Sequence, residues 1–307
     1  MEALVTGSAG FLGRHMVRGL AVAGYRVLGA DIAHERGAWD ALHLFKNETE
    51  RFDVVVHCAA VAPHRSAIDG RALAVGAGNL ELDAAMFRWA ARTRPGRVVY
   101  LSSSAAYPVR LQTHEWVEAH GPRRLGERDI NLTQWGKTGD WSPDAIYGWV
   151  KLTGERLAEA YRAQGGAVTV VRPFSGYGED QSASFPFGAF RDRARRGEDP
   201  FVIWGSGEQV RDWIHVDDVV GAVLAAVDAE ADGPLNICTG VGTSMAELAA
   251  MFCAEAGYDP RFEYLPDRPA GVAYRVGDPT LLHEVYVPRV SLAEGVKRAL
   301  AAPPINM

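Results

Sequence analysis

The first residues of the chain place a short apolar strand, a glycine-rich turn and a helix directly after one another. Ala3-Leu-Val5 precedes the run Thr6-Gly-Ser-Ala-Gly10-Phe-Leu-Gly13, and apolar residues then recur at helical spacing from Phe11 to Ala23. Glycines in this order permit a tight turn, a close backbone approach to a pyrophosphate and a helix N-terminus aimed at its charge. The glycine pattern alone is weak, but its place between a strand and a helix is the context that dinucleotide binding requires. The residues predicted to contact a dinucleotide here are Gly7, Gly10, Phe11, Leu12 and Gly13.

Strands and helices continue to alternate along the first half of the chain. Short apolar runs predict further strands at 25–30, 52–57, 97–101 and 167–171. Helical spacing predicts helices near 80–91 and 143–163. This alternation predicts an α/β fold, a Rossmann doubly wound parallel sheet covered by helices on both faces.

The pattern becomes irregular after Arg172-Pro173, with loops, a helix near 187–196 and later segments rich in Gly and Pro. We therefore predict a nucleotide-binding Rossmann domain at 1–172 and a smaller C-terminal substrate-binding lobe at 173–307. Residues 209–240 are expected to return to the first domain. No linker-like stretch separates the two parts, so we expect them to pack as one unit.

Composition excludes several classes of protein. The chain has 307 residues and a net charge of -6, which disfavours non-specific nucleic-acid binding. It has no apolar run of membrane-spanning length and no basic-then-apolar leader at Met1, so we expect a cytoplasmic protein that does not bind membranes. The three cysteines, Cys58, Cys238 and Cys253, are too scattered for a disulfide framework or zinc site and are interpreted as small buried residues. No spacing of His or carboxylate residues suggests a metal.

Asp31 indicates which dinucleotide is bound. It lies eighteen residues after Gly13, at the end of the second predicted strand. A carboxylate there can accept hydrogen bonds from both ribose hydroxyls and repels a 2′-phosphate, so NAD is favoured over NADP. Ile32 is expected to line the same site. Asp31 could instead be a surface cap of the next segment, and nearby Arg36 keeps NADP open as an alternative.

Tyr147 and Lys151 add redox chemistry to the dinucleotide site. Residues four apart share a helix face, so the Lys ammonium can lie near the phenol and favour its ionised form. A Tyr with an ordinary pKa of about 10 is a poor base at neutral pH. A neighbouring cation and an oxidised nicotinamide ring could make Tyr147 able to remove a proton from a hydroxyl.

These features stand in the order typical of one family. The residues concerned are Gly7, Gly10, Gly13, Asp31, His57-Cys-Ala-Ala60, Asn79, Ser102-Ser-Ser104, Tyr147 and Lys151. Two later segments also match: Arg172-Pro-Phe-Ser-Gly-Tyr-Gly178 and Trp204-Gly-Ser-Gly-Glu-Gln-Val-Arg-Asp-Trp-Ile-His-Val-Asp-Asp218. The chain resembles the extended short-chain dehydrogenases/reductases, specifically the NAD-dependent epimerase/dehydratase family acting on nucleotide sugars. The resemblance runs almost from end to end.

The resemblance implies roles for individual residues. Tyr147 would be the catalytic base, Lys151 its electrostatic partner and ribose ligand, and Ser103 the hydroxyl donor to the reacting sugar oxygen. Ala59, Ala60 and Asn79 would line the cofactor cleft or fix its loops. Ser104 is structural by default, with substrate contact as the alternative. His57 and His215 are interpreted as structural core residues.

The resemblance also implies a nucleotide-sugar site in the lobe. Arg211 and Arg268 would bind the diphosphate, which the acidic chain otherwise lacks the charge to hold. Trp204 could cover the nucleotide base and Asp278 could meet its ribose, although packing or capping is the alternative for both. Ser175 occupies a position where the family usually has Asn, and Asp40 is a weak candidate for an acidic contact near adenine, because the strand expected between 31 and 52 is poorly marked.

Departures from the family narrow the reaction. The 4,6-dehydratases carry an Asp-Glu pair after the catalytic Ser, whereas this chain has Ser104-Ala105, so dehydration is disfavoured. The 3,5-epimerases of GDP-mannose and the fucose-forming epimerase-reductases place a Cys where this chain has Ala105, so their carbon-acid chemistry lacks its expected catalyst.

A long connection separates Tyr107 from Tyr147 by forty residues and should lie over the active site. Its aromatic and charged residues are His114, Glu115, Trp116, His120, Arg123, Arg124, Trp135 and Trp141. It could be a packed lid whose charges face water. Alternatively, one of its basic residues reads an unusual sugar substituent such as a carboxylate.

The sequence therefore predicts a nucleotide-sugar epimerase that acts at C4 through transient oxidation by NAD, with a UDP-sugar favoured as substrate. A reductase of a 4-keto sugar is the main alternative, with a dehydratase and a non-catalytic NAD-sensing protein less favoured. A homodimer built on the helices near Leu80 and Tyr147 is implied by the resemblance. The sugar and its nucleotide are not identified by the sequence.

Overall fold

A computed structural model describes residues 1–33, 40–61, 70–130 and 141–303. The alternatives that rested on Arg36 and Trp135 lie outside these residues.

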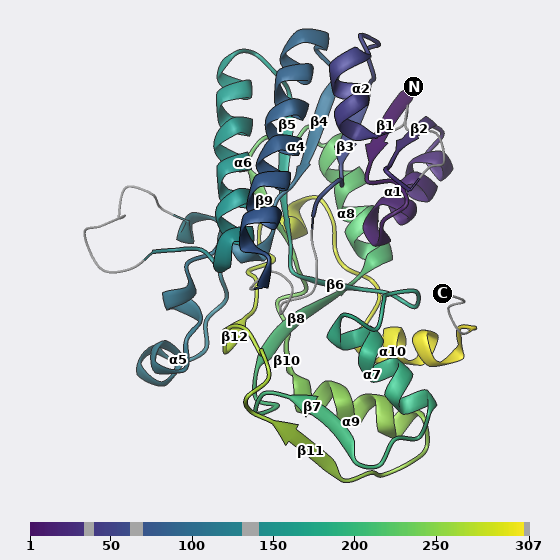
Figure 1. Ribbon diagram of the computed structural model, residues 1–307, viewed down its shortest axis with the longest axis vertical. Helices are drawn as coiled ribbons and strands as arrows, with labels where there is room; N and C mark the ends of the chain where they lie inside the picture. Colours follow the sequence, from purple (N-terminus) through teal and green to yellow (C-terminus); the bar gives the residue numbers. More distant parts are fainter. Residues whose placement is uncertain (34–39, 62–69, 131–140, 304–307) are drawn as a thin grey trace.

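A six-stranded parallel sheet forms the larger part of the molecule (Figure 1). Its strands follow the order β2-β1-β3-β4-β5-β9, in which the chain reverses direction across the sheet at β1 and β3. The bounds are β1 (Glu2–Thr6), β2 (Arg26–Ala30), β3 (Val54–His57), β4 (Arg97–Leu101), β5 (Val168–Pro173) and β9 (Pro234–Ile237). The order is that of a doubly wound fold, whose ligand site lies at the carboxyl ends of the strands near the reversal.

Helices cover both faces of this sheet. The helices α1 (Phe11–Val22) and α8 (Val216–Asp228) bury their apolar sides against one face. The other face is covered by α2 (Ala41–Asn47), α4 (Ala72–Thr93) and α6 (Ala145–Ala163). The predicted α/β class and doubly wound parallel sheet are therefore confirmed.

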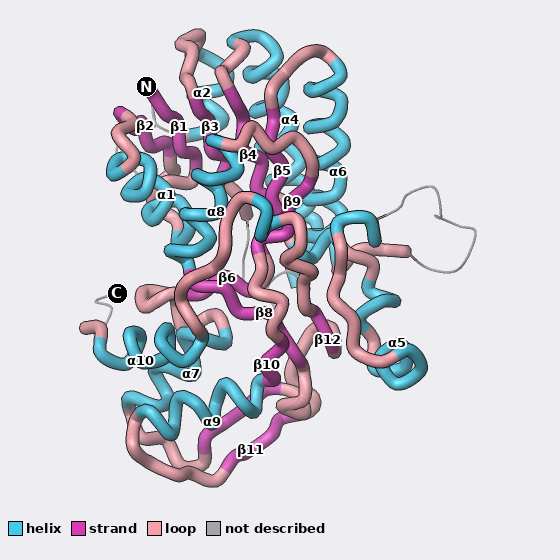
Figure 2. Tube along the Cα trace, turned by 180° about the vertical axis from the view of Figure 1, so that it is seen from behind, coloured by secondary structure: helices cyan, strands magenta, loops and turns pink. Residues whose placement is uncertain are grey.

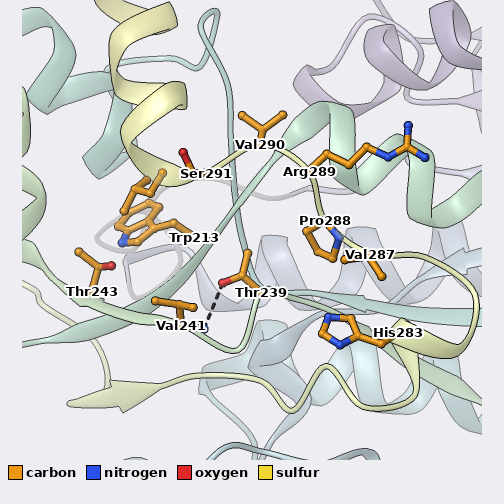
Figure 3. A pocket seen from close by; sticks show the side chains of 11 residues that line it. Trp213, Thr239, Val241, Thr243, His283, Val287, Pro288, Arg289, Val290 and Ser291 are labelled. Carbon is orange, nitrogen blue, oxygen red and sulfur yellow. Dashed lines mark hydrogen bonds between the residues drawn. The ribbon is translucent and has the colours of Figure 1, made fainter.

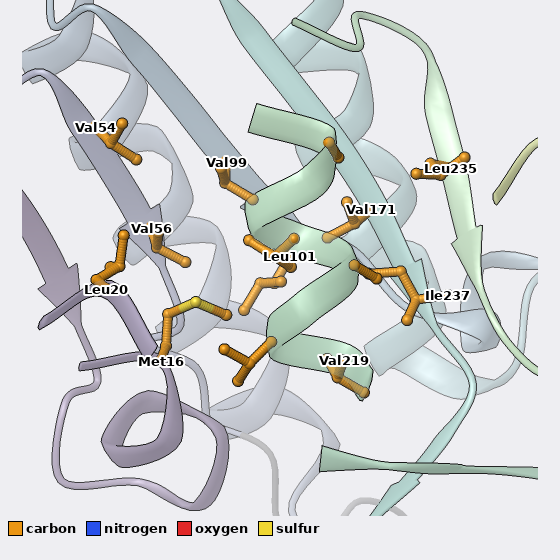
Figure 4. Packing of buried hydrophobic residues seen from close by; sticks show 14 of the residues in the cluster. Met16, Leu20, Val54, Val56, Val99, Leu101, Val171, Val219, Leu235 and Ile237 are labelled. Carbon is orange, nitrogen blue, oxygen red and sulfur yellow. The ribbon is translucent and has the colours of Figure 1, made fainter. Parts of the chain in front are cut away.

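The core between the sheet and α8 explains why the sequences of the parallel strands are continuous apolar runs. Met16 and Leu20 of α1 and Val219 of α8 pack against inward residues such as Val56 and Val99 (Figure 4). All these side chains are almost completely buried. A parallel strand with helices on both faces has no solvent side, so alternation of polar residues is absent.

The smaller lobe lies below the carboxyl ends of the parallel strands in Figure 1. Its mixed sheet joins β6 (Ser175–Tyr177), β8 (Val210–His215), β10 (Gly242–Ser244) and β12 (Tyr274–Arg275), and a second pair joins β7 (Phe201–Trp204) to β11 (Phe262–Leu265). The helices α7 (Pro186–Arg195), α9 (Met245–Glu255) and α10 (Leu292–Ala301) pack around an aromatic core with Tyr177, Phe187 and Phe252.

Short elements connect the two parts on the side of α6. They are η2 (Ser104–Ala106), η3 (Val109–Gln112), α5 (His114–His120) and η4 (Glu127–Asp129). A further short element, η6 (Leu282–Glu284), lies on the opposite face of the sheet, where Leu282 packs beneath α8. The tube in Figure 2 shows α5 projecting beside the lobe on the same side as α6.

Several elements differ from the expected boundaries. The helix expected at 80–91 begins at Ala72, because the small residues before Leu80 continue the helical turn. Among the described residues between 31 and 52 the structure has helix α2, and Asp40 caps it by accepting a hydrogen bond from the Leu42 amide. Asp40 is thus a helix cap.

Segment 209–240 is divided between the two parts. Strand β8 belongs to the mixed sheet of the lobe, whereas α8 packs on the large sheet and β9 is its last strand. Residues beyond 280 also return, since Leu282 is completely buried in the core beneath α8. None of the helices in the described parts of the chain combines the length and apolar character needed to cross a bilayer.

Candidate active site

The glycine-rich turn follows β1 at the carboxyl end of the sheet. Gly7 has a φ of +67°, and its amide donates to the Ala30 carbonyl at 2.7 Å. A Cβ on Gly7 would lie 2.6 Å from the Ala59 nitrogen, and one on Gly13 only 1.9 Å from the Gly7 carbonyl oxygen. Side chains are therefore excluded from the turn, and α1 begins at Phe11 directly after it, with no side chain capping its first amides. These residues fit the requirements of a dinucleotide pyrophosphate.

Asp31 lies at the end of the neighbouring strand, as its spacing predicts. Its carboxylate accepts hydrogen bonds from the Ala9 amide at 3.0 Å and from the Ala33 amide at 2.9 Å. The carboxylate is thus held against the glycine-rich turn, where a bound ribose would reach its remaining lone pairs. Ile32, beside it, is 84% exposed, so its side chain is free to cover a ligand.

The segment after β3 forms the opposite wall of this edge. The Ala59 amide donates to Thr6 Oγ1 at 3.3 Å, and Ala59 and Ala60 are both partly exposed. Asn79 of α4 is buried and accepts from the Val61 amide at 2.9 Å while donating to the Val61 carbonyl at 2.8 Å. Of the two roles expected for Asn79, its contacts favour fixing the loop.

Tyr147 and Lys151 lie on one face of α6, beside the ends of β4 and β5. The Lys151 ammonium lies 5.7 Å from the centroid of the Tyr147 ring and donates to the Leu101 carbonyl at 2.8 Å. Lys151 is 2% exposed, whereas Tyr147 is only partly buried. The cation is therefore fixed inside the protein, whereas the Tyr147 ring keeps contact with solvent.

Ser103 lies at the N-terminal end of η2, against the first turn of α6. Its hydroxyl accepts a hydrogen bond from the Ala105 amide at 3.1 Å, which leaves the O–H free to donate to a ligand. A Cβ on Gly148 would lie 2.2 Å from the Ala105 carbonyl oxygen, so α6 approaches this turn as closely as glycine permits. The fold thus brings Ser103, Tyr147 and Lys151 to one place.

A buried carboxylate lies beneath Lys151. Asp83 of α4 is 1% exposed, accepts from the Tyr100 hydroxyl at 2.7 Å and lies 3.3 Å from His57 Nε2. His57 is also hydrogen-bonded to Thr6 at 2.8 Å, and the Lys151 ammonium lies 5.2 Å from the Tyr100 ring centroid. Burial raises the pKa of Asp83, but the contact with His57 and the Lys151 charge offset this and hold it below its usual value.

A second buried charge pair joins β5 to α6. The Arg172 guanidinium donates to both carboxylate oxygens of Glu155, at 2.8 and 2.7 Å. Ser102 donates to the same carboxylate at 2.5 Å, and Arg172 also donates to the Tyr107 hydroxyl at 3.2 Å. The predicted Arg-Pro segment is therefore anchored to the helix that carries Tyr147, four residues beyond Lys151.

Three of the residues predicted to bind the substrate lie together in the lobe. Trp204 ends β7 with 42% of its surface exposed, and the Arg268 guanidinium lies 5.6 Å from the centroid of its ring. Arg211 of β8 donates to the Ala270 carbonyl at 3.0 Å, two residues from Arg268. Two cations and an exposed aromatic ring are groups that would suit a nucleotide and its phosphates.

The other predicted substrate contacts are distributed more widely. Ser175 is partly exposed in β6, beside β8, and Ser104 is 6% exposed beneath the Ser103 turn. The Asp278 carboxylate accepts from the Thr280 amide at 3.0 Å and its hydroxyl at 2.6 Å, and it lies next to Gly126 of the long connection. The capping alternative for Asp278 therefore has direct support.

In the described part of the long connection, arginine side chains contact aromatic rings, a carboxylate and a backbone carbonyl. The Arg110 guanidinium lies 4.8 Å from the ring centroid of Trp141 and 5.5 Å from that of Trp116. Arg123 pairs with Asp129 at 2.5 Å, and Arg124 donates to the Gly240 carbonyl at 2.9 Å. These contacts favour a packed lid, in which Arg110, Arg123 and Arg124 already have partners within the protein.

A cavity of about 340 Å³ lies elsewhere, between β8, β10 and the segment that precedes α10 (Figure 3). It is lined by Trp213, Thr239, Val241, Thr243, His283, Val287, Pro288, Arg289, Val290, Ser291 and Leu292. None of the residues predicted for cofactor or substrate lines it. Cys238 and Cys253 are buried as expected, whereas Cys58 is partly exposed.

Asp83 and Glu155 were not predicted as parts of the site, although the sequence contains a signal for both. Asp83 follows Asn79 by four residues, and Glu155 follows Lys151 by four, so each lies on a helical stripe with another polar site residue. Polar residues on the inward stripe of a helix require partners. Which partners they find depends on strands far away in the sequence.

Comparisons with known proteins identify relatives of this chain. The family model of the NAD dependent epimerase/dehydratase family matches residues 3–238. A dTDP-4-dehydro-6-deoxy-D-allose reductase of Streptomyces bikiniensis is 29% identical, covering 92% of this chain and 89% of the relative. The UDP-glucose 4-epimerase of Thermotoga maritima, solved with UDP-glucose, has 26% identity, a TM-score of 0.80 and 98% coverage of both chains. The protein MoeE5, solved with UDP-glucuronic acid and NAD, has 26% identity, a TM-score of 0.79 and the same coverage.

Proposed function

Because the chain belongs to the NAD-dependent epimerase/dehydratase family, with NAD as its cofactor, we propose that it is a nucleotide-sugar epimerase acting at C4. The coarser class, an NAD-dependent enzyme that modifies nucleotide sugars, follows from the family and the relatives. The UDP-sugars bound by two similar structures favour a UDP-sugar as substrate.

The observation that carries the proposal is the arrangement around Tyr147. A buried ammonium, a half-buried phenol and a serine hydroxyl meet beside the glycine-rich edge of the sheet. The residues after Ser103 are Ser104 and Ala105, both buried, so no carboxylate pair for dehydration stands there. The groups present suit removal and return of a hydroxyl proton.

Each residue has a distinct role in the proposed mechanism. Tyr147 removes the proton of the C4 hydroxyl, and Ser103 donates a hydrogen bond to the same oxygen as it becomes a carbonyl. Lys151, held by the Leu101 carbonyl, places a fixed positive charge near the phenolate. NAD supplies hydride acceptance and return. Rotation of the keto sugar between these two events inverts C4.

The alternative is a reductase of a 4-keto sugar that uses the same three residues. The identity of 29% to a dTDP-4-dehydro-6-deoxy-D-allose reductase favours this second function. The two differ in cofactor balance, because an epimerase regenerates NAD in each turnover and a reductase consumes a reduced cofactor. A product assay therefore separates them.

Proton NMR of the purified protein with UDP-, GDP-, dTDP- and CDP-sugars, without reduced cofactor, tests the proposal. A new anomeric signal at constant redox state is the expected result and would identify the sugar. Turnover of a 4-keto sugar only after addition of NADH or NADPH would replace the epimerase with the reductase.

Tyr147→Phe provides a test at the level of the residue. Loss of the phenol should lower kcat by a factor of about 100 or more, because general acid–base catalysis contributes that much. Binding of NAD and of the nucleotide sugar should remain nearly unchanged, as calorimetry can measure. Retained turnover would remove Tyr147 as the base.

We also propose that the chain forms a homodimer through α4 and α6. Leu73 and Leu80 of α4 are 85% and 42% exposed, and Trp149 of α6 is 36% exposed. Exposed apolar side chains on adjacent helices are typical of an interface. Light scattering of the wild-type protein and of Leu80→Glu would test it, with the variant expected to be monomeric.

A further inference from the structure

An ion pair joins the lobe to the beginning of the helix that carries Tyr147. Arg275 of β12 donates from Nη2 to Asp144 Oδ2 at 2.8 Å. The two side chains are 11% and 10% exposed, so water screens the pair little. Asp144 immediately precedes α6, and Tyr147 lies three residues beyond it.

The Asp144 carboxylate binds Arg275 of the lobe rather than capping α6. An Asp at the N-terminal end of a helix normally accepts a hydrogen bond from an amide of the first turn. Asp144 makes no such bond, and the next residue, Ala145, has a φ of +54°. A left-handed backbone at a residue with a side chain is strained and persists only where its surroundings impose it.

The same turn of α6 also contacts the Ser103 segment. The Asp144 amide donates to the Ala105 carbonyl at 2.8 Å, and Gly148 approaches that carbonyl as closely as glycine allows. A displacement of Asp144 would therefore move Tyr147 relative to Ser103.

On the lobe side of the ion pair, Arg275 lies in β12, beside the predicted nucleotide-binding strand β8. Strand β12 pairs with β8 in parallel register, with Arg275 opposite Arg211, the predicted diphosphate ligand. Arg275 Nε also donates to the side-chain oxygen of buried Gln112 at 2.5 Å. The backbone carbonyl of Gln112 accepts in turn from the Ala273 amide at 3.0 Å. The guanidinium is thus fixed to the lobe and the long connection at once.

We propose that Arg275 is a positioning residue that couples nucleotide binding in the lobe to the placement of Tyr147 through Asp144. The inference rests on the proposed function, in which Tyr147 acts on the sugar, and on the predicted role of Arg211 as a diphosphate ligand. Nucleotide binding that fixes β8 also fixes β12 and, through the ion pair, the first turn of α6. A shift of about 1 Å at a reacting group can change a rate by about 100-fold, so such coupling would act on kcat.

Hydrogen exchange measures the coupling without turnover. Calorimetry first selects the tightest-binding nucleotide among UDP, dTDP, GDP and CDP. In the wild-type protein this nucleotide should slow amide exchange at residues 145–149. In Arg275→Met the nucleotide should bind with unchanged affinity but give no protection there. Protection that persists in Arg275→Met would overturn the coupling.

A double variant guards against misfolding. Arg275→Met alone removes the cation beside the buried Asp144 carboxylate, which is destabilising. Arg275→Met/Asp144→Asn removes both charges and should lose the same protection. Arg261→Met is the matched control, because Arg261 is an 80% exposed arginine of the lobe that pairs with Asp199 at the surface. It should retain the wild-type protection.

Kinetics with the substrate found by NMR gives the second readout. Arg275→Met should lower kcat about tenfold or more with KM nearly unchanged, and the double variant should be no slower than either single variant. Losses of kcat that add in the double variant would show that Arg275 and Asp144 act separately. That result, or a rise in KM with kcat unchanged, would overturn the proposal. Failure of all four nucleotides to bind would instead refute the proposed function, and the coupling with it.

Discussion

Asp83 illustrates how a buried charge is accommodated in this site. Its carboxylate has the Tyr100 hydroxyl and His57 as neighbours, and the Lys151 ammonium lies over the Tyr100 ring. A buried carboxylate remains ionised only where such partners offset the loss of hydration. The charge of Lys151 therefore has a counterion on α4, outside the Tyr/Lys motif that identified the site.

The depressed pKa of Asp83 predicts how stability depends on pH. A group whose pKa is lower in the folded state stabilises the fold above its unfolded value, about 3.9, and this contribution disappears as pH falls through the folded value. Asp83→Asn should therefore lower the unfolding free energy by about 2 kcal/mol between pH 5 and 8. The difference from wild type should shrink below pH 4. Urea unfolding at several pH values would measure it.

Glu81→Gln, at an exposed position of the same helix, is the control for this experiment. It should have little effect on stability at any pH. A difference for Asp83→Asn that grows toward low pH would contradict the assignment of an ionised carboxylate.

Helix α6 connects the motif to the rest of the fold. Tyr147, Lys151 and Glu155 succeed one another at intervals of four and lie on its inward side. The outward side carries pairs such as Arg156 and Glu159, which are 45% and 49% exposed. The same helix therefore has a buried ion pair, Arg172–Glu155, and an exposed one that can be compared with it.

Arg172→Met should destabilise the protein by about 3–5 kcal/mol, because it leaves Glu155 buried without its cation. Arg156→Ala should change stability by no more than about 0.5 kcal/mol, since exposed pairs contribute little. Chemical unfolding of both variants would measure the contrast. Equal effects would mean that burial does not set the strength of these pairs.

The helices and strands of the nucleotide-binding half could be predicted because their sequence signals are local. The strand–glycine–helix order and the spacing of Tyr147 and Lys151 each lie within one element, and their expected places agree with the structure. The partners of Lys151 could not be predicted, because Leu101 and Asp83 come from other elements. Helix α2 was missed because its seven residues lie in a region where a strand was expected.

At the scale of the whole molecule, the chain crosses repeatedly between the large sheet and the lobe. Buried Asp212 of β8 stands where two crossings meet. Its carboxylate accepts from the Thr239 amide and hydroxyl, the Gly240 amide and the Gly277 amide. These loops follow β9 and β12, so one carboxylate ties together segments that no local pattern relates. The sequence predicted that 209–240 would return to the large sheet, but it gave no signal for the place of β8 in the lobe or for the burial of Leu282 beneath α8.

Asp212→Ala tests whether this carboxylate joins the two parts into one cooperative unit. Three amides and a hydroxyl would lose their acceptor in a buried place, at a cost of about 1–3 kcal/mol for each group that finds no water. Wild type should unfold in a single calorimetric transition, whereas in Asp212→Ala the lobe should melt first and give two. Exchange of β8 amides should rise more than that of β4 amides.

Asp267→Ala, at an exposed carboxylate of the lobe, should retain one transition. A single transition in Asp212→Ala, shifted as a whole, would mean that the apolar contacts of α8 suffice to couple the sheet to the lobe.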